Sequence, residues 1–482
     1  MPKCTIDGQE VEFQPGENLV EVAKRVGIDI PFFCYHPGLS VVAQCRMCAV
    51  EIEKNPKLQT ACSTPAQEGM VVHTKSERTK KNQASVMEFL LINHPLDCAI
   101  CDKSGECDLQ DFSFKYGSQY MRTTEERRTY DADDMGPVIK KNMNRCIHCT
   151  RCIRFAEEVA GIPEMVAVQR GNHTEITTVT GEPLQTGYAA NYADICPTGS
   201  LTLKDFRFRK RVWYLKKTPS VCDGCSRGCN IEVHEDQDKI YRLLPRKNME
   251  INKYWMCDEG RFGFHYVNIP DRVIKPMLKN GATLQETTWE DALRAVMGKA
   301  GKRLILIGTD LTLEEASEIR DLAKSTTFAG DLFHFGTKGL ASAKDDGDED
   351  KILKRLSKTA NLHGIDAMGI PGFSGKTDGY QSVVIFRGGK AQLPSLPDSL
   401  PVFGIGVFMQ GETKTMQAVL PGFAFAEKDG TIVNFQGVKQ QWQRAIQPPA
   451  TAKSVSEISA LLQGRKPTNL GPGLAKWEEQ RV

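Results

Sequence analysis

The stretch R-C-I-H-C-T-R-C-I-R, residues 145–154, spaces three cysteines as C-x2-C-x2-C. Thiolates at this spacing are typical ligands of a 4Fe-4S cluster, which takes four protein ligands. A further cysteine stands far downstream and is followed at once by Pro197. The sequence therefore predicts one 4Fe-4S site, whose ligands are Cys146, Cys149, Cys152 and Cys196.

This ligand set resembles half of a two-cluster bacterial ferredoxin. In such ferredoxins the run C-x2-C-x2-C-x3-C-P occurs twice, and each cluster takes its fourth ligand from the other run. In this chain the four positions that would bind the second cluster hold Ala156, Thr186, Ala189 and Tyr192 instead of cysteine. The resemblance implies a ferredoxin-like module, residues 122–205, that has kept one cluster and lost the other. Strands are expected at 166–169 and 174–180.

Composition limits the functional class. A chain of 482 residues is expected to hold several domains. A net charge of +2 gives no reason to expect a nucleic-acid partner. No apolar run of 18 residues occurs, so no membrane span is predicted. The first residues enter a strand pattern directly, which predicts no targeting peptide and a cytoplasmic location.

The cysteines are better explained by metal than by disulfides, because a reducing compartment keeps thiols free. Fifteen of the sixteen cysteines fall into four groups with ligand spacing, the last of which ends at Cys257. Cys4 stands apart, and we expect it to be a buried strand residue.

The first group follows a predicted hairpin, in which residues 3–6 and 9–13 are joined by Asp7-Gly8, and a helix over 18–26. A strand is predicted at 49–53. This order resembles a plant-type ferredoxin of β-grasp form over residues 1–75, although the first spacing is ten residues instead of four. The predicted site is a 2Fe-2S cluster, with zinc as the alternative. Its ligands are Cys34, Cys45, Cys48 and Cys62.

The second group, within residues 76–121, follows a predicted amphipathic helix at 76–93. Its pattern is H-x3-C-x2-C-x5-C. A histidine before proline is usually a turn residue, but three cysteines leave one iron of a 4Fe-4S cluster without a ligand. We therefore predict a 4Fe-4S site in which a neutral imidazole replaces one thiolate. Its ligands are His94, Cys98, Cys101 and Cys107.

The fourth group, within residues 218–272, has the spacing C-x2-C-x3-C-x27-C, which suits either zinc or 4Fe-4S. The three neighbouring sites favour 4Fe-4S. Its ligands are Cys222, Cys225, Cys229 and Cys257. Between the third and fourth groups, residues 204–217 carry many bases interleaved with aromatics. This run has two interpretations. It is either a binding site for phosphate or an acidic partner, or a solvated linker whose aromatic side chains form its underside.

The four patterns, in this order over residues 1–265, resemble the largest peripheral-arm iron-sulfur subunit of NADH:quinone oxidoreductase, respiratory complex I. The resemblance implies an electron-transfer subunit with one 2Fe-2S and three 4Fe-4S clusters. Electrons would come from a partner flavoprotein that carries FMN and the NADH site, and pass toward the quinone-side subunits of the peripheral arm. The complex would lie at the cytoplasmic face of a bacterial inner membrane. In family members that have it, the fourth cluster is regarded as lying off the main path.

The last region, residues 273–482, reads as an α/β domain, with strands predicted at 303–308, 382–386 and 402–407 and a helix at 312–325. Residues 425–437 are similar to the molybdopterin oxidoreductase pattern E-x-x-G-T-x-x-N-x-E-G, from which Gln436 departs. Catalytic relatives have lysine in C-x-K-G-R, where this chain has Glu259. The resemblance implies a shortened, vestigial domain without molybdopterin. The fold class is multidomain α+β and α/β.

No motif for bond-making chemistry is present: the chain has no phosphate-binding loop, no convincing dinucleotide fingerprint and no nucleophile signature. We predict no catalytic residue and no NADH or quinone site in this chain. One alternative is the diaphorase subunit of an NAD-reducing hydrogenase. Iron-only hydrogenases and molybdenum formate dehydrogenases are disfavoured, because they need further metal-binding cysteine or selenocysteine residues and none follows Cys257.

Overall fold

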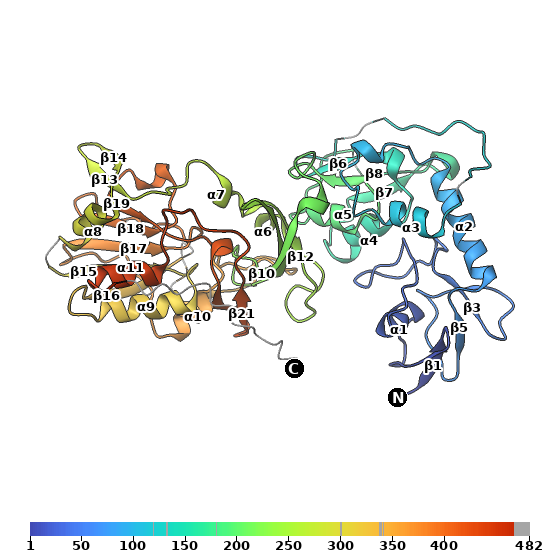
Figure 1. Cartoon of the computed structure of the whole chain (residues 1–482), viewed down its shortest axis with the longest axis horizontal. Helices are drawn as coiled ribbons and strands as arrows, with labels where there is room; N and C mark the ends of the chain where they lie inside the picture. Colours follow the sequence, from blue (N-terminus) through green and yellow to red (C-terminus); the bar gives the residue numbers. More distant parts are fainter. Residues whose placement is uncertain are drawn as a thin grey trace. The chain divides into compact units, whose positions relative to one another are not determined.

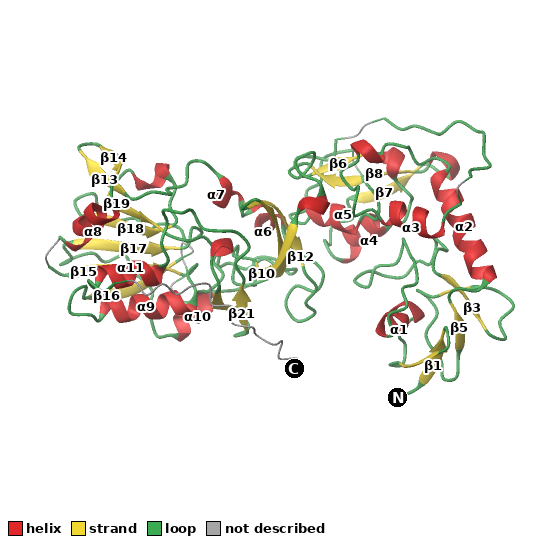
Figure 2. Ribbon diagram, viewed as in Figure 1, coloured by secondary structure: helices red, strands yellow, loops and turns green. Residues whose placement is uncertain are grey.

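The structure is a computed structural model that describes residues 1–118, 120–131, 134–179, 181–298, 301–336, 340 and 342–466. It divides the chain into two compact units, Met1–Leu215 and Lys216–Val482. Helices and strands occur in both units (Figures 1 and 2). Among the described residues no helix is both long enough and apolar enough to cross a membrane.

A five-stranded sheet with the order β2-β1-β5-β3-β4 opens the first unit. Its strands are β1 (Lys3–Ile6), β2 (Gln9–Glu12), β3 (Ala49–Ile52), β4 (Gln59–Thr60) and β5 (Val71–His73). The predicted hairpin is confirmed, since β1 and β2 pair antiparallel and Asp7 and Gly8 both have positive φ. Helix α1 (Leu19–Arg25) begins after Asn18, whose side chain caps it. Cys4 is buried in β1, as predicted.

The rest of the first unit consists of short elements around loops. They are α2 (Glu77–Leu91), η1 (Cys98–Ile100), α3 (Asp108–Tyr116), β6 (Ile139–Lys141), η2 (Met143–Arg145), α4 (Arg151–Glu158), β7 (Met165–Val168), η3 (Gly171–His173), β8 (Glu175–Thr178), α5 (Ala190–Ile195), β9 (Leu201–Leu203) and η4 (Val212–Tyr214). The strands β7 and β8 pair, as do β6 and β9. The strand predictions at 166–169 and 174–180 are confirmed, except that Thr180 lies outside the described residues.

The second unit begins with the three-stranded sheet β10-β11-β12 and then forms a seven-stranded sheet with the order β14-β13-β19-β18-β17-β15-β16. The strands β16, β15, β17, β18 and β19 run parallel, and β13 is antiparallel to β19. The predicted strands at 303–308, 382–386 and 402–407 are confirmed as β15, β17 and β18. The predicted helix at 312–325 is confirmed as α9, which Thr312 and Glu315 begin with a capping box.

The elements of this unit have the following bounds. The strands are β10 (Lys216–Val221), β11 (Asn230–Asp236), β12 (Lys239–Pro245), β13 (Met277–Asn280), β14 (Thr283–Glu286), β15 (Arg303–Gly308), β16 (Gly330–Phe335), β17 (Ser382–Arg387), β18 (Val402–Gly406), β19 (Met416–Pro421), β20 (Gly430–Val433) and β21 (Lys439–Trp442). The helices are α6 (Asp258–Phe262), α7 (His265–Asn268), α8 (Trp289–Met297), α9 (Leu313–Ala323), α10 (Leu362–Ala367) and α11 (Val455–Leu462), with 3-10 turns η5 (Ala343–Asp345), η6 (Gln410–Thr413) and η7 (Phe425–Glu427).

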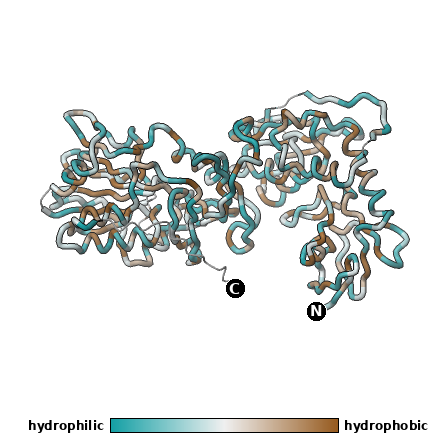
Figure 3. Tube along the Cα trace, viewed as in Figure 1, coloured by the Kyte–Doolittle hydropathy of each residue, from teal (hydrophilic) through white to brown (hydrophobic). Residues whose placement is uncertain are grey.

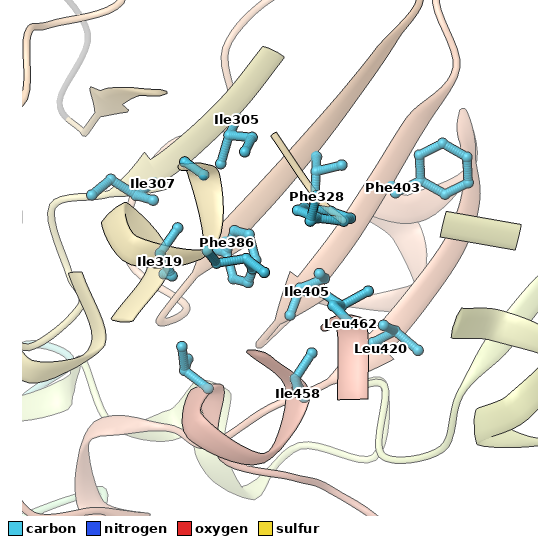
Figure 4. Close-up of a cluster of buried hydrophobic side chains, with 14 of the residues drawn as sticks. Ile305, Ile307, Ile319, Phe328, Phe386, Phe403, Ile405, Leu420, Ile458 and Leu462 are labelled. Atoms are coloured by element: carbon cyan, nitrogen blue, oxygen red, sulfur yellow. The ribbon is translucent and has the colours of Figure 1, made fainter. Parts of the chain in front are cut away.

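The seven-stranded sheet separates two hydrophobic clusters. Ile305 and Ile307 of β15 join the cluster that includes residues of α8, α9 and α11 (Figure 4). Leu304 and Leu306, whose side chains alternate with them, belong to the other cluster. Hydrophobic segments, brown in Figure 3, follow the central strands. A sheet buried on both faces explains the nearly continuous apolar sequence of these strands.

A buried ion pair joins Arg272 to Glu427 in this unit. Two hydrogen bonds of 2.6 and 2.7 Å connect the guanidinium to the carboxylate. Their side chains are 3% and 2% exposed. Glu427 also accepts a hydrogen bond from the backbone of Ala424, so the pair fixes the chain that leads into β20.

Arg272→Met is expected to lower the free energy of unfolding of the second unit by about 3 to 5 kcal/mol, because it leaves the Glu427 carboxylate buried and unpaired. Urea unfolding followed by tryptophan fluorescence measures this change. Arg294→Met, which breaks an exposed pair with Glu290, is the control and is expected to have little effect. Equal losses in the two variants would contradict the prediction.

Candidate iron–sulfur sites

The four predicted 2Fe-2S ligands lie together beside the first sheet. Pairing of Ala49 with Thr60 between β3 and β4 brings Cys48 and Cys62 to the same end of the two strands. The Cys34 thiol interacts with the thiols of Cys45 and Cys62, and the Cys48 thiol with that of Cys62. The interaction with Cys45 lowers the pKa of the Cys34 thiol. Sulfur groups in mutual contact suit a site where iron neutralises several thiolates.

The His94 group begins where α2 ends. The backbone N–H of His94 donates to Leu91 O over 3.2 Å, and its Nδ1 is buried without a hydrogen-bond partner among the described residues. Burial lowers the pKa of His94 to about 4, so the imidazole is neutral at pH 7. A neutral ring with an unsatisfied buried nitrogen fits a metal ligand. His94, Cys98 and Cys107 line one cavity.

Cys101 is not among the residues that line this cavity, although it is buried at the end of η1. Its sulfur lies against the backbone of Gly199, where an added Cβ would overlap the Cys101 Sγ atom. Nearby, the Cys107 thiol donates to Pro197 O over 3.7 Å. The chain just after Cys196 therefore contacts two predicted ligands of the His94 group.

The third group lines a single cavity, which is bounded by Cys146, Cys149, Cys152 and Cys196. The loop turns through His148 and Thr150, which have φ of 53° and 58°, before α4 begins. Burial raises the pKa of Cys146 to about 12 and of Cys149 to about 11. Thiols with raised pKa are protonated at pH 7, and metal binding supplies the positive charge that favours their ionised form.

Packed side chains fill the positions at which a two-cluster ferredoxin would bind its second cluster. Ala156 and Tyr192 are both fully buried. The Tyr192 ring packs edge-to-face against Phe155 at a centroid distance of 5.0 Å. The space near these positions is therefore occupied by hydrophobic core, which fits a module with one cluster.

The fourth group lies in the second unit and lines another cavity, which is bounded by Cys222, Cys225, Cys229 and Cys257. The backbone N–H of Cys222 donates to Cys229 O over 2.8 Å, which closes the loop between β10 and β11. Backbone N–H groups of Gly224 and Gly260 donate to the sulfurs of Cys222 and Cys257, each over 3.3 Å. Hydrogen bonds to cluster sulfurs are one means by which a protein tunes the reduction potential.

Two lysines from a distant segment, Lys354 and Lys358, also line the fourth cavity. The Lys358 ammonium donates to Glu259 Oε2 over 3.1 Å. Glu259 occupies the position where catalytic molybdopterin relatives have lysine. The sequence pattern around Cys257 does not indicate that the Lys358 ammonium binds the Glu259 carboxylate.

The segment that resembles the molybdopterin pattern, residues 425–437, and the strand β21 that follows it hold the fourth loop. Gln440 donates to Gly228 O over 2.7 Å, and the Trp442 indole donates to Val221 O over 3.0 Å. The backbone of Phe435 donates to Ser226 O over 2.9 Å. This segment is therefore part of the support of the predicted cluster site.

The basic run at 204–217 differs from its predicted form. Arg211 donates to Cys101 O over 2.7 Å, whereas Phe208 and Trp213 are exposed. The expectation of an aromatic underside holds for Phe206, which is buried, but not for Phe208 and Trp213, because the guanidinium of Arg211 contacts the His94 group instead. The alternative, a site for phosphate or an acidic partner, stays a prediction. No spacing in the sequence marks Arg211 for this role.

Within the described residues, no group of three or more His, Cys, Asp or Glu is close enough to hold a single metal ion. Ligands of a 4Fe-4S cluster stand farther apart than ligands of one ion, because each binds a different iron.

Known families match each of these regions. The family described as "2Fe-2S iron-sulfur cluster binding domain" matches residues 3–77, and "NADH-ubiquinone oxidoreductase-G iron-sulfur binding region" matches 83–122. "NADH-quinone oxidoreductase subunit 3, ferredoxin-like domain" matches 136–202. "Molybdopterin oxidoreductase Fe4S4 domain" matches 215–269, and "Molybdopterin oxidoreductase" matches 405–465.

Curated relatives agree with these matches. The NADH-quinone oxidoreductase G-subunit of Rickettsia bellii is 44% identical over 299 residues, which cover 62% of this chain and 44% of the relative. The mitochondrial NADH-ubiquinone oxidoreductase 78 kDa subunit of Candida albicans is 41% identical over 62% of this chain and 42% of its own. The 75 kDa subunit of Reclinomonas americana is 37% identical over 73% of this chain and 52% of its own. The chain is therefore similar to the G-subunits of NADH-quinone oxidoreductase and their mitochondrial counterparts over 62% to 73% of its own length.

The chain spans about half the length of the curated relatives it matches, 42% to 52% in these three. It is a mixed α/β chain that contains 2Fe-2S, 4Fe-4S and molybdopterin-oxidoreductase-like domains. A crystal structure of an NAD+-reducing NiFe-hydrogenase in the H2-reduced state is 31% identical, covers 44% of this chain and 91% of its own, and has a TM-score of 0.39.

Proposed function

We propose that this chain is an electron-transfer subunit of NADH:quinone oxidoreductase. The observation that carries the proposal is the contact between successive ligand groups of the first unit. Gly199 and Pro197, just after the third group's Cys196, contact Cys101 and Cys107 of the His94 group. Clusters held by adjoining loops suit the passage of electrons through the chain.

The ligand sets are those that the sequence predicts, with one 2Fe-2S and three 4Fe-4S clusters. When bound, the clusters supply one-electron oxidation and reduction. The residues of this chain hold them and adjust their potentials through hydrogen bonds to sulfur. NADH oxidation and quinone reduction then take place on other subunits, and the chain contributes no catalytic side chain.

The partners in this proposal are the FMN- and NADH-binding flavoprotein subunit and the quinone-side subunits of the peripheral arm. The location is the cytoplasmic face of a bacterial inner membrane, reached through the complex. The domains are residues 1–75, of β-grasp form, then 76–121, 122–205, 218–272 and 273–482. The last domain is vestigial and binds no molybdopterin. Glu259 and Gln436, which depart from the catalytic pattern, support this assignment.

Anaerobic iron and sulfide analysis with EPR is expected to give about fourteen irons per chain, from one 2Fe-2S and three 4Fe-4S centres. The chain should be isolated without oxygen, and zinc should be measured in the same samples. About ten irons with stoichiometric zinc would reassign the Cys222 group to zinc.

Co-purification separates the proposal from the hydrogenase alternative. The relatives are named as subunits of NADH-quinone or NADH-ubiquinone oxidoreductase, which favours other subunits of that enzyme as partners. A set of membrane-embedded subunits that co-purifies with the tagged chain would support the proposal. A nickel hydrogenase subunit that co-purifies with the tagged chain would overturn the proposal in favour of the diaphorase role.

A further inference from the structure

One face of α4 joins the third ligand group to the 2Fe-2S loop. Arg151, Arg154 and Glu158 lie on this face, because residues three or four apart share one side of a helix. Arg151 donates to Tyr35 O over 2.6 Å, and Glu158 accepts from the backbone of Ser40 over 2.8 Å. The same helix carries Cys152, a predicted ligand of the third group. The helix therefore docks one ligand loop onto the other.

Arg154 makes a more specific connection than its neighbours. Its Nη2 atom donates to Cys34 O over 2.6 Å and to Cys149 O over 3.2 Å. Cys34 is a predicted 2Fe-2S ligand and Cys149 a predicted 4Fe-4S ligand. One nitrogen thus bridges the main-chain carbonyls of ligands from two sites. Both hydrogen bonds are buried.

We propose that Arg154 is a positioning residue for electron exchange between the 2Fe-2S cluster and the cluster of the Cys146 group. The inference rests on the proposed function and deepens it. Arg154 fixes the distance between the two ligands and offers a short bonded route from one sulfur to the other through the two carbonyls. With both clusters bound, an electron that takes this route would oxidise the 2Fe-2S centre by one electron and reduce the 4Fe-4S centre by one electron, with no proton or bond transferred.

The charge of Arg154 adds a second effect. A guanidinium keeps its positive charge in proteins, and a cation near a cluster stabilises the reduced, more negative form. Arg154 is therefore expected to raise the reduction potentials of both centres. Charge and bridging geometry are separable, because lysine keeps the charge but lacks the planar fork of the guanidinium.

Arg151 provides a matched control on the same helix. It is 6% exposed, compared with 5% for Arg154, and it donates to two carbonyls, whereas Arg154 donates to three, because its Nη1 atom also binds Ser40 O. Its acceptors, Tyr35 O and Ile195 O, belong to residues next to predicted ligands and not to the ligands themselves. Arg151→Gln removes a comparable buried cation and leaves the connection between Cys34 and Cys149 in place.

The test uses the full chain, loaded anaerobically with iron and sulfide and reduced with dithionite. Iron content, midpoint potentials and magnetic coupling between the two centres in EPR are measured, together with the exchange rate by rapid freeze-quench. Arg154→Gln is expected to lower both midpoint potentials, weaken the coupling and slow the exchange about tenfold, the low end of the losses in activity that follow removal of an outer partner of a metal ligand. Arg154→Lys is expected to keep the midpoint potentials of both centres but to show weaker magnetic coupling and slower electron exchange. Arg151→Gln is expected to keep both coupling and rate.

Equal coupling and rate in Arg154→Gln and wild type, or equal losses in Arg154→Gln and Arg151→Gln, would overturn the inference alone. If Arg154→Gln fails to fold or to bind its clusters, the coupling and exchange rate of Arg154→Lys are compared with those of the wild type instead, and equal values would overturn the inference. A wild-type chain that binds no 2Fe-2S cluster would overturn the proposed function, and the inference with it.

Discussion

Gly199→Ala is expected to remove the cluster of the His94 group, so that iron content falls from about fourteen to about ten per chain. The added Cβ would overlap the Cys101 sulfur and would also lie 3.4 Å from Lys103 Cβ and 3.5 Å from Arg145 Cδ. The Cβ position is fixed by the backbone, so the cysteine must move. A displaced Cys101 leaves one iron without its ligand. Anaerobic iron analysis and EPR of the purified chain measure the loss.

The expected loss is confined to one group. Gly199 follows Cys196, but its added Cβ would point at Cys101, so the signal of the Cys146 cluster should persist. Gly411→Ala is the control, because its Cβ would meet no atom within 4 Å and its φ is not left-handed. About fourteen irons in Gly199→Ala, with an unchanged spectrum, would contradict the placement of Cys101 beside this backbone.

Local signals were sufficient for most of the secondary structure. The Asp7-Gly8 turn, the Asn18 cap and the Thr312 cap each act within a few residues, and the structure has all three. The ligand groups are also predicted from spacing, because cysteines that bind one cluster from a single loop must be closely spaced. The structure brings the members of the third and fourth groups around single cavities.

The contacts between the ligand groups, and with the segments that support them, could not be predicted from the sequence. Arg154, Arg211 and Gln440 bind backbone carbonyls, and every residue offers a carbonyl, so no residue type marks the acceptor. The partners are also far apart along the chain, up to 212 residues in the case of Gln440 and Gly228. Spacing rules describe neighbours within one loop. The packing of one loop on another depends on the whole core, which explains why Lys358 was missed beside Glu259.

His94→Ala is expected to reduce the iron content by about one to four atoms per chain, because one iron of the cluster loses its protein ligand. The unsatisfied buried Nδ1 and the neutral ring support ligation, since a turn histidine would be expected to bind water or a backbone group. His173→Ala, at an exposed position in η3, is the control and should keep all its iron. Unchanged iron and an unchanged EPR spectrum in His94→Ala would show that His94 is not a ligand.

His94→Cys keeps a ligand at this position but changes the charge of that ligand. A thiolate can replace the imidazole as a ligand, so the iron content should stay at about fourteen per chain. The thiolate adds a negative charge, which disfavours the reduced form, and the midpoint potential of this cluster alone should fall. The sign agrees with Rieske centres, in which histidine in place of cysteine raises the potential. A redox titration followed by EPR measures the shift, and a higher potential in His94→Cys would contradict a charge-based role for the imidazole.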